Sequence, residues 1–257
     1  MFIEERHHKI LEFLQKTGRV EVPELSQIFE VSEDSIRRDL RIMEEKGLVK
    51  RTYGGAILPL KSSQSILYNE RKNIEVEKKT AIAKIAASFV EDYDTVILDS
   101  SSTIAEMVPY LNNKSGLTII TNSISIANDV VNFTTDNKLF LVGGLIDRES
   151  MNTNSIESFQ IFQKITADKV FIGPCGISSS RGLSATSFNE ANIKKAIIEA
   201  GKEAFILADQ DKFGQSFLAN IGPLQPRYHI ITDSNLPDGI ILGFDELIRQ
   251  GLRITTG

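Results

Sequence analysis

The sequence predicts an α/β protein in two parts, and three observations carry this prediction. Residues 1–58 have the apolar spacing of three short helices, followed by a tight Gly-Gly turn. From residue 76 onward, apolar strand-like runs alternate with helical segments, which favours a mostly parallel, Rossmann-like sheet with helices on both faces. Residues 59–75 between them are polar and lack strong periodicity. We therefore expect domains at 1–58 and 76–257, joined by a linker at 59–75.

Composition limits the classes of protein that need to be considered. The 257 residues hold 29 Lys and Arg against 34 Asp and Glu, so nucleic-acid binding would require a local basic patch. The apolar runs are shorter than the roughly 20 residues that span a bilayer, and the charged start is unlike a signal peptide. A single cysteine, Cys175, excludes an internal disulfide and a cysteine zinc cluster. We expect a protein of the reducing cytoplasm.

The remaining metal and nucleophile candidates are weak. The three histidines, His7, His8 and His229, are not spaced as metal ligands, and we expect His7 and His8 to be solvated. Cys175 has no histidine near it in sequence, which favours a small buried residue over a nucleophile. The sequence therefore predicts neither a metal site nor a cofactor.

The first part has helix boundary signals at regular intervals. One amphipathic helix ends at Gly18, and a second begins near Pro23, which suits the first turn of a helix. Ser32 is a suitable N-cap for a third helix, which we expect to end at Gly47. The run "LVKRTYGGAIL" then predicts two short strands joined by a turn. Three helices followed by a hairpin are typical of a winged helix-turn-helix.

The third helix carries the residues that suit DNA contact. Its apolar positions Ile36, Leu40 and Met43 share one face, so the arginines project mostly away from it. Arginine suits guanine edges and phosphate. Lys50 and Arg51 on the predicted hairpin, or wing, suit phosphate. Residues 32–51 carry six Lys and Arg against five Asp and Glu, so charge is sorted by face. An ordinary solvated basic face is the alternative. The candidate DNA-contacting residues are Ser35, Arg37, Arg38, Arg41, Lys50, Arg51, Tyr53, Gly54 and Gly55.

The second part begins with a helix around 77–90 and continues as alternating strands and helices. The expected strands are 95–99, 117–121, 138–144, 168–173, 203–209 and 228–233. The expected helices between them are 103–111, 123–131, 155–165 and 189–201.

Ligands of open α/β sheets bind at the carboxyl ends of the strands, and here those ends are rich in hydroxyl and glycine residues. Main-chain N–H groups, hydroxyls and a lysine could together hold an anion. Each feature alone is more often an N-cap, a turn or a surface lysine, but their joint occurrence favours a site. The candidate ligand-binding residues are Asp99, Ser100, Ser101, Ser102, Thr103, Thr121, Asn122, Ser123, Gly143, Gly144 and Lys212.

The segment "VEVPELSQIFEVSEDSIRRDLRIMEEKGLVKRTYGGAI" resembles the N-terminal signature of the DeoR family of bacterial transcription regulators. The resemblance covers nearly all of residues 6–57, and "IRRDL" followed by "GGA" is its most specific part. Ser35 stands where the family usually has Thr, and Tyr53 where it usually has His. The resemblance implies a DNA-binding regulator, a repressor of a carbohydrate-use operon, acting on double-stranded operator DNA as a homo-oligomer (dimer or tetramer).

The second part resembles the ribose-5-phosphate and glucosamine-6-phosphate isomerase group, as DeoR sensor domains do. The matching elements, in order, are 99–103, Thr121-Asn122-Ser123, Gly143-Gly144, the segment "FIGPCGISSSRGLS" with Gly176, and 209–214. This isomerase-like resemblance implies a phosphorylated sugar as effector and adds Gly176 to the candidate effector-binding residues. Ser101 replaces an expected Gly, and Asp211 adds a carboxylate beside Lys212, so effector affinity or identity stays open.

Two alternatives remain beside the sensor hypothesis. Isomerisation needs a positioned base, and "GPCGISSS" lacks the acidic residues that the isomerases carry there. Glu190 and Asp147 remain possible bases outside a matching motif, so we expect a body that binds without catalysis. The first alternative is a sugar-phosphate isomerase with a DNA-binding head. The second is a DNA-binding protein whose body serves only for oligomerisation.

Overall fold

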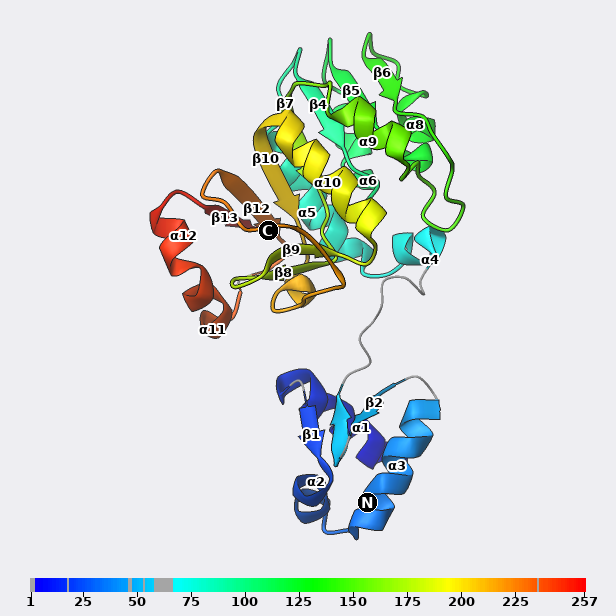
Figure 1. Ribbon diagram of the computed structural model, residues 1–257, viewed down its shortest axis with the longest axis vertical. Coiled ribbons are helices and arrows are strands. Elements are labelled where there is room, and N and C mark those ends of the chain that lie inside the picture. The colour runs from blue at the N-terminus through cyan, green and yellow to red at the C-terminus, as the bar shows by residue number, and fades with distance from the viewer. Residues whose placement is uncertain (1–2, 18, 46–47, 53, 58–66, 235) are drawn as a thin grey trace. The chain divides into compact units, whose positions relative to one another are not determined.

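The computed structural model describes residues 3–17, 19–45, 48–52, 54–57, 67–234 and 236–257 (Figure 1). The chain divides into two compact units, residues 1–65 and 66–257, which we call the head and the body. The expected helix end at Gly47, the turn residue Tyr53 and the linker around 59–65 fall outside the described residues.

The head combines three helices with a three-stranded antiparallel sheet of order β1-β3-β2. Its elements are α1 (Ile3–Thr17), β1 (Arg19–Glu21), α2 (Val22–Phe29), α3 (Glu33–Glu45), β2 (Lys50–Thr52) and β3 (Gly55–Ile57). Ile36, Leu40 and Met43 of α3 are at most 1% exposed and form part of one apolar core. Ser32 caps α3 by accepting the Ser35 N–H at 3.3 Å, as its place in the sequence predicts.

The body is built on a seven-stranded, wholly parallel sheet of order β13-β12-β10-β7-β4-β5-β6. Its strands are β4 (Thr95–Leu98), β5 (Thr118–Thr121), β6 (Lys138–Leu141), β7 (Ala167–Ile172), β10 (Gly201–Leu207), β12 (Tyr228–Thr232) and β13 (Arg253–Thr256). Its helices are α4 (Tyr68–Lys72), α5 (Val76–Ser88), α6 (Ser102–Ala105), α7 (Val108–Leu111), α8 (Ile124–Val130), α9 (Ile156–Phe162), α10 (Phe188–Ala200), α11 (Asp238–Ile241) and α12 (Asp245–Arg249), with 3₁₀ turns at Gln210–Lys212 and Leu242–Phe244.

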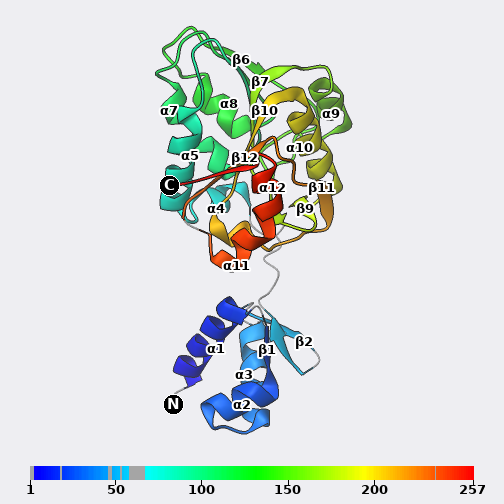
Figure 2. The ribbon, with the colours of Figure 1, turned by 90° about the vertical axis from the view of Figure 1, so that its left-hand side faces the viewer.

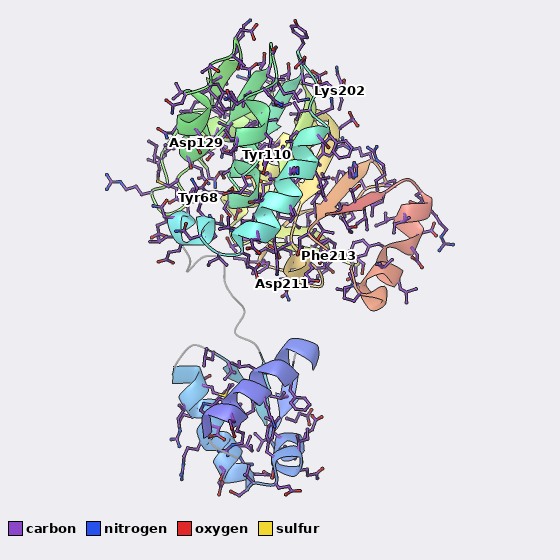
Figure 3. All side chains as sticks on the ribbon, turned by 180° about the vertical axis from the view of Figure 1, so that it is seen from behind. Tyr68, Tyr110, Asp129, Lys202, Asp211 and Phe213 are labelled. Atoms are coloured by element: carbon purple, nitrogen blue, oxygen red, sulfur yellow. The ribbon has the colours of Figure 1, made fainter. Side chains whose placement is uncertain are left out.

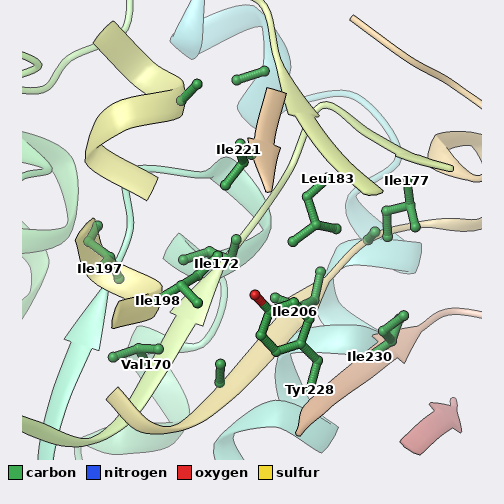
Figure 4. Packing of buried hydrophobic residues seen from close by; sticks show 14 of the residues in the cluster. Val170, Ile172, Ile177, Leu183, Ile197, Ile198, Ile206, Ile221, Tyr228 and Ile230 are labelled. Carbon is green, nitrogen blue, oxygen red and sulfur yellow. The ribbon is translucent and has the colours of Figure 1, made fainter. Parts of the chain in front are cut away.

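Helices cover both faces of this sheet, as the uniformly apolar strands require. α5, α7 and α8 lie on one face, and α9 and α10 lie on the other (Figure 2). The first face buries side chains such as Phe171 and Phe205, whose rings stack at 4.8 Å between centroids. The second face buries Val170 and Ile206 of the strands against Ile197 of α10 (Figure 4).

A second, antiparallel sheet of order β11-β9-β8 lies at the end of the body where the parallel strands finish. It consists of β8 (Gly176–Ser178), β9 (Gly182–Ala185) and β11 (Ala219–Gly222). Its residues Ile177, Leu183 and Ile221 join the apolar core of the second face (Figure 4). Lys202 at the start of β10 and Asp211 after its end lie at opposite ends of the body, so the strands run toward the end that holds Asp211 (Figure 3).

Strand order places a topological switch point at the centre of the sheet. The chain moves outward from β4 to β5 and β6, and then returns to β7 on the other side of β4. The connections that follow β4 and β7 therefore lead away in opposite directions, and ligands of open α/β sheets bind at such a point. The predicted ligand-binding loop after β4 lies at this point.

The structure also holds elements that the sequence did not predict. β1, β8, β9, β11 and β13 are each three or four residues long, and their sequences lack the continuous apolar run that marks β4, β5 and β6. The helix expected at 103–111 is two helices, α6 and α7, separated at Glu106 and Met107. None of the described helices combines the length and apolar character needed to cross a membrane.

Candidate DNA-contacting and effector sites

The arginines of α3 are exposed, and their electrostatic surroundings differ. Arg37 donates to Glu33 at 2.6 Å and to Asp34 at 3.1 Å, both in the preceding turn of the helix. Arg38 and Arg41 are exposed and form no ion pair with any described residue. Their guanidinium groups are therefore the arginine charges of α3 that are least neutralised within the described part of the helix.

Asp39, which stands between these arginines in sequence, points into the head. Its carboxylate accepts from Arg6 Nε at 2.6 Å and lies 3.2 Å from His7 Nε2. All three residues are buried, so the expectation that His7 is solvated is wrong. This contact could not be predicted from local sequence patterns, because its two sides lie on α1 and α3, more than thirty residues apart. Asp39 thus joins α1 to α3 and does not oppose DNA phosphate.

The wing residues divide into an exposed and a packed group. Gly54 is exposed, has a φ of +91° and could carry no side chain without strain, as the predicted turn requires. Gly55 is buried, and a Cβ there would collide with the main chain of Val20 in β1. Arg51 is exposed on β2. The side chains of Lys50 and Tyr53 lie outside the described part of the head.

In the body, Asp99 joins the loops that follow β4 and β7. Its carboxylate accepts the Gly173 N–H at 2.7 Å and pairs with Lys194 Nζ of α10 at 2.7 Å, with both side chains at most 3% exposed. Lys194 was not among the predicted site residues. The available signal was that it lies on the apolar face of α10, one turn after Glu190. The ion pair neutralises an aspartate that would otherwise repel a bound anion.

Glu190, whose side chain is 19% exposed, adjoins this pair of buried charges. It lies 3.4 Å from Lys194 and accepts the Thr186 hydroxyl at 3.1 Å. Burial would raise the pKa of Glu190, but the charges of Lys194 and Arg71 and the Thr186 hydrogen bond hold it below its ordinary value. Its oxygens also lie 3.8 and 3.9 Å from Cys175 Sγ, so the fold brings Glu190 to the segment "GPCGISSS". Cys175 is buried, as expected.

The serines after β4 are engaged to different degrees. Ser100 Oγ accepts from the Asn152 amide at 2.8 Å, and Ser101 Oγ caps α6 by accepting the Thr103 N–H at 3.2 Å. Ser101 also packs against Gly173, where a Cβ would collide with it, so a neighbouring glycine accommodates the side chain of Ser101. The hydroxyls of Ser102 and Thr103 have no hydrogen-bond partner in the described ranges.

The end of β5 is ordered mostly by its own side chains. Thr121 donates its hydroxyl to the Leu98 carbonyl at 2.7 Å and accepts the Ser123 N–H at 3.0 Å, and Ser123 in turn caps α8. Asn122 differs. Its amide nitrogen donates to Asn154 Oδ1 at 3.0 Å, while its buried Oδ1 has no partner among the described residues. A buried acceptor of this kind is normally satisfied by water or ligand.

The predicted glycines are placed by packing. Gly144 has a φ of +146° and lies against the hydroxyls of Ser155 and Ser158, and the Gly143 carbonyl accepts from Ser158 at 2.9 Å. Gly176 begins β8, and a Cβ there would collide with the main chain of Gln215. Gly144 and Gly176 therefore have a structural reason apart from ligand contact, whereas a Cβ at Gly143 would meet no atom within 4 Å.

Lys212 lies in the 3₁₀ turn after β10 and is half-buried. Its ammonium forms no ion pair or hydrogen bond within the described part of the chain. The neighbouring Asp211 pairs with Lys78 at 3.1 Å, and Lys78 also reaches Glu75 at 3.0 Å. Oxygens of Glu75, Asp209 and Asp211 lie within 4.8 Å of one another, but the Lys78 ammonium supplies the positive charge for this group. The extra carboxylate of Asp211 is thus neutralised by Lys78.

Arg71 of α4 is a second cation that the sequence analysis missed. Its Nε is buried without a hydrogen-bond partner among the described residues, and its main-chain carbonyl accepts from Lys79. Its charge acts on Glu190, and α4 itself contacts α6, the helix that follows β4. The polar segment around 66–73 carried no motif that would have marked it.

A cavity of about 380 Å³ lies elsewhere, between α6, α7 and α8. It is lined by Lys72, Ala105, Glu106, Val108, Pro109, Asn112, Asp129, Asn132 and Phe133. None of the predicted effector residues lines it. The cavity and the predicted strand-end residues are therefore separate parts of the body.

Comparison with known proteins agrees with both halves of the sequence resemblance. Residues 6–62 match the DeoR-like helix-turn-helix domain, and residues 74–234 match the DeoR C-terminal sensor domain. A solved D-ribose-5-phosphate isomerase in complex with phospho-erythronic acid aligns over 54% of each chain, with 16% identity and a TM-score of 0.40.

Curated relatives cover nearly the whole chain. The HTH-type transcriptional regulator GolR of Listeria innocua is 32% identical over 250 residues, which are 96% of this chain and 96% of GolR. IolR, an HTH-type transcriptional regulator of Bacillus subtilis, is 31% identical over 91% of this chain and 92% of its own length. The glycerol-3-phosphate regulon repressor of Escherichia coli is 30% identical over 92% of this chain and 93% of its own length. The chain is a transcription regulator with a DNA-binding head and a sensor body, and it belongs to the DeoR family.

Proposed function

We propose that this regulator is a cytoplasmic repressor of carbohydrate-use genes whose affinity for operator DNA is changed by a phosphorylated sugar. The observation that carries the proposal is a set of polar atoms in the body that lack a hydrogen-bond partner among the described residues. Arg71 Nε of α4 and Asn122 Oδ1 after β5 are buried without one, and the half-buried Lys212 after β10 forms no ion pair or hydrogen bond there. Cations suit a phosphate, and an amide oxygen suits a sugar hydroxyl.

Several features of the body fit a negatively charged effector. Asp99 is neutralised by Lys194, and Asp211 by Lys78, so these two acids do not oppose an anion. The free hydroxyls of Ser102 and Thr103 can donate to phosphate oxygens. One curated relative is named for a glycerol-3-phosphate regulon, which also fits a small phosphorylated polyol or sugar. The remaining predicted residues, Ser100, Ser101, Thr121, Ser123 and the three glycines, would position the loops around the ligand.

A thermal-shift screen of the full chain against sugar phosphates tests the effector. A ligand that binds only the folded state stabilises it by about 2.7 kcal/mol at a hundredfold excess over its Kd, which raises the melting temperature. We expect a specific phosphorylated sugar to raise it, and the unphosphorylated sugar to have no effect. A blank across the panel, with operator binding intact, would support a body that serves only for oligomerisation.

In the head, we propose that α3 enters the major groove with Arg38 and Arg41, while Arg51 and Gly54 of the wing lie along the backbone. Arg37, Ser35 and the wing residues Lys50, Tyr53 and Gly55 complete the proposed surface. Arg38→Ala should weaken binding to DNA from upstream of the protein's own gene by about 1–3 kcal/mol if Arg38 grips a base edge. Lys195→Ala, which removes a body cation that is 60% exposed, should leave binding unchanged. Equal losses in both variants, measured by fluorescence anisotropy, would contradict the assignment.

Coupling between the two sites follows from linkage. Suppose that the effector binds more tightly to an arrangement of subunits that does not fit the operator. The effector then lowers the affinity for operator DNA, and operator DNA lowers the affinity for the effector by the same factor. A symmetric operator requires at least two heads, so the regulator would act as a homo-oligomer.

One observation favours the enzymatic alternative enough to test it. Glu190 lies beside Cys175 at the strand ends, where a base for isomerisation would be needed. However, its pKa is held below the ordinary value, and Lys194 and Thr186 occupy its oxygens, which makes it a poor base. We therefore propose that the body binds without turnover. Conversion of a pentose or hexosamine phosphate by the purified chain, abolished in Glu190→Gln, would overturn this.

A further inference from the structure

The outer edge of the body's sheet presents exposed apolar residues and unpaired main-chain groups. Within the described residues, β6 pairs with β5 alone (Figure 1). Phe140 and Leu141 on this strand are 51% and 46% exposed, and Leu145 and Ile146 in the following loop are 80% and 55% exposed. Proteins usually protect such an edge with charges, prolines or bulges, but Lys138 is the only charged residue between 138 and 146.

The pairing with β5 fixes which main-chain groups face outward. The N–H groups of Lys138 and Val142 donate to carbonyls of the β5 segment, each at 2.8 Å. Successive residues of a strand turn their N–H and C=O groups to opposite sides. Leu139 and Leu141 therefore present theirs at the free edge.

We propose that two copies of the chain pair through β6, antiparallel across a two-fold axis at Phe140, to form one continuous sheet. In this register, Leu139 of one copy exchanges both N–H···O bonds with Leu141 of the second copy. Phe140 lies directly opposite Phe140 of the second copy as a non-hydrogen-bonded pair, where side chains approach most closely and aromatic pairs add stability. An axis at Leu139 would place the exposed Phe140 opposite Lys138, and an axis at Leu141 would carry the pairing past the end of β6 as far as Gly143.

The charge pattern is compatible with this self-association. Lys138 falls opposite Val142 of the second copy, a buried apolar residue. The two Lys138 Cα atoms are then separated by about 14 Å along the strands, beyond the Debye length of about 8 Å at physiological salt. The same patch on both copies forms the contact, which is the isologous arrangement of a closed dimer.

This inference goes beyond the proposed function and does not depend on it. The pairing uses none of the proposed effector or DNA-contacting residues. It supplies the two heads that a symmetric operator requires.

Cysteine cross-linking of the full chain tests the register directly. Cα atoms of a non-hydrogen-bonded pair lie about 4.5 Å apart, within the roughly 4.4–6.8 Å that a disulfide spans. Phe140→Cys should form a covalent dimer on mild oxidation, visible on a non-reducing gel. Leu218→Cys is the matched control, because Leu218 is 73% exposed and lies away from β6, and the native Cys175 is buried. No more dimer in Phe140→Cys than in Leu218→Cys would overturn the proposal.

A second test introduces a charge at the proposed axis and needs no oxidation. Phe140→Lys places two like charges directly opposite each other and should weaken self-association by about tenfold or more. Sedimentation equilibrium of the full chain would report this, and an unchanged melting curve at low concentration would show that the variant folds. Leu218→Lys should keep the wild-type mass. A wild-type chain that is monomeric at micromolar concentration, or a Phe140→Lys variant that keeps the wild-type mass, would overturn the proposal.

Discussion

Asp39 in the head and Asp99 in the body are aspartates beside sites proposed to receive phosphate. Each is turned inward and neutralised: Asp39 by Arg6 and His7, and Asp99 by Lys194. Removing one partner of such a buried group leaves an uncompensated charge, which costs more than the pair itself contributes. At the scale of single residues, these acids therefore organise the sites that exposed cations are proposed to use.

Asp39→Asn should destabilise the head by about 3 kcal/mol, because Arg6 would remain buried without a carboxylate. The matched control is Asp34→Asn. Asp34 is 89% exposed and pairs with Arg37 on the same helix, so its loss should change stability by less than about 0.5 kcal/mol. Hydrogen exchange at the amides of Ile10 and Leu40 would report the stability of the head within the full chain. Equal effects of the two variants would show that Asp39 does not join α1 to α3.

At the scale of elements, α10 fixes the loops of the switch point through Lys194. The short local patterns of this region were predictable: the strand runs, the Ser32 cap and the order of the motifs all follow from neighbouring residues. Lys194 was not, because its partner Asp99 is 95 positions away and only the parallel sheet brings them together. The small sheet of β8, β9 and β11 was not predicted either, because its short strands lack a continuous apolar run.

Lys194→Met should destabilise the body by about 3–5 kcal/mol, because Asp99 and Glu190 would remain buried as unpaired acids. Adding Asp99→Asn should recover part of this loss, which a double-mutant cycle would measure by urea unfolding. The neighbouring Lys195→Met is the control, since Lys195 is 60% exposed. If Lys194→Met and Lys195→Met were equally stable, the Asp99–Lys194 pair would not hold the loops together.

At the scale of the whole molecule, apolar cores pack against both faces of the body's sheet, and they enclose the titratable group of His229. His229 of β12 packs between Phe89 and Phe205, with ring centroids at 4.7 and 5.3 Å. Burial, aided by the charge of Arg253, lowers the pKa of His229 to about 4. The folded body therefore holds a neutral imidazole that the unfolded chain would protonate below about pH 6.5.

Stability of the body should fall as pH drops from about 6.5 toward 4. The sign follows from linkage, since the unfolded state binds the proton first in this window, and the full loss is about 3 kcal/mol. Hydrogen exchange at the amides of Phe205 and Ile230 across this pH range would measure it. In His229→Gln, the part of the slope due to this group should vanish. An unchanged slope in the variant would contradict the assignment.

The most direct test of the central claim is an operator titration, with and without the sugar phosphate found by thermal shift, on the wild-type chain and on Lys212→Ala. We expect the effector to change operator affinity of the wild type by about 5–150-fold, the usual range of allosteric coupling. Lys212→Ala should bind operator with wild-type affinity and lose most of this response, because it removes a proposed phosphate contact and leaves the head intact. A wild-type affinity that no phosphorylated sugar changes, or a full response in Lys212→Ala, would contradict the proposed sensor.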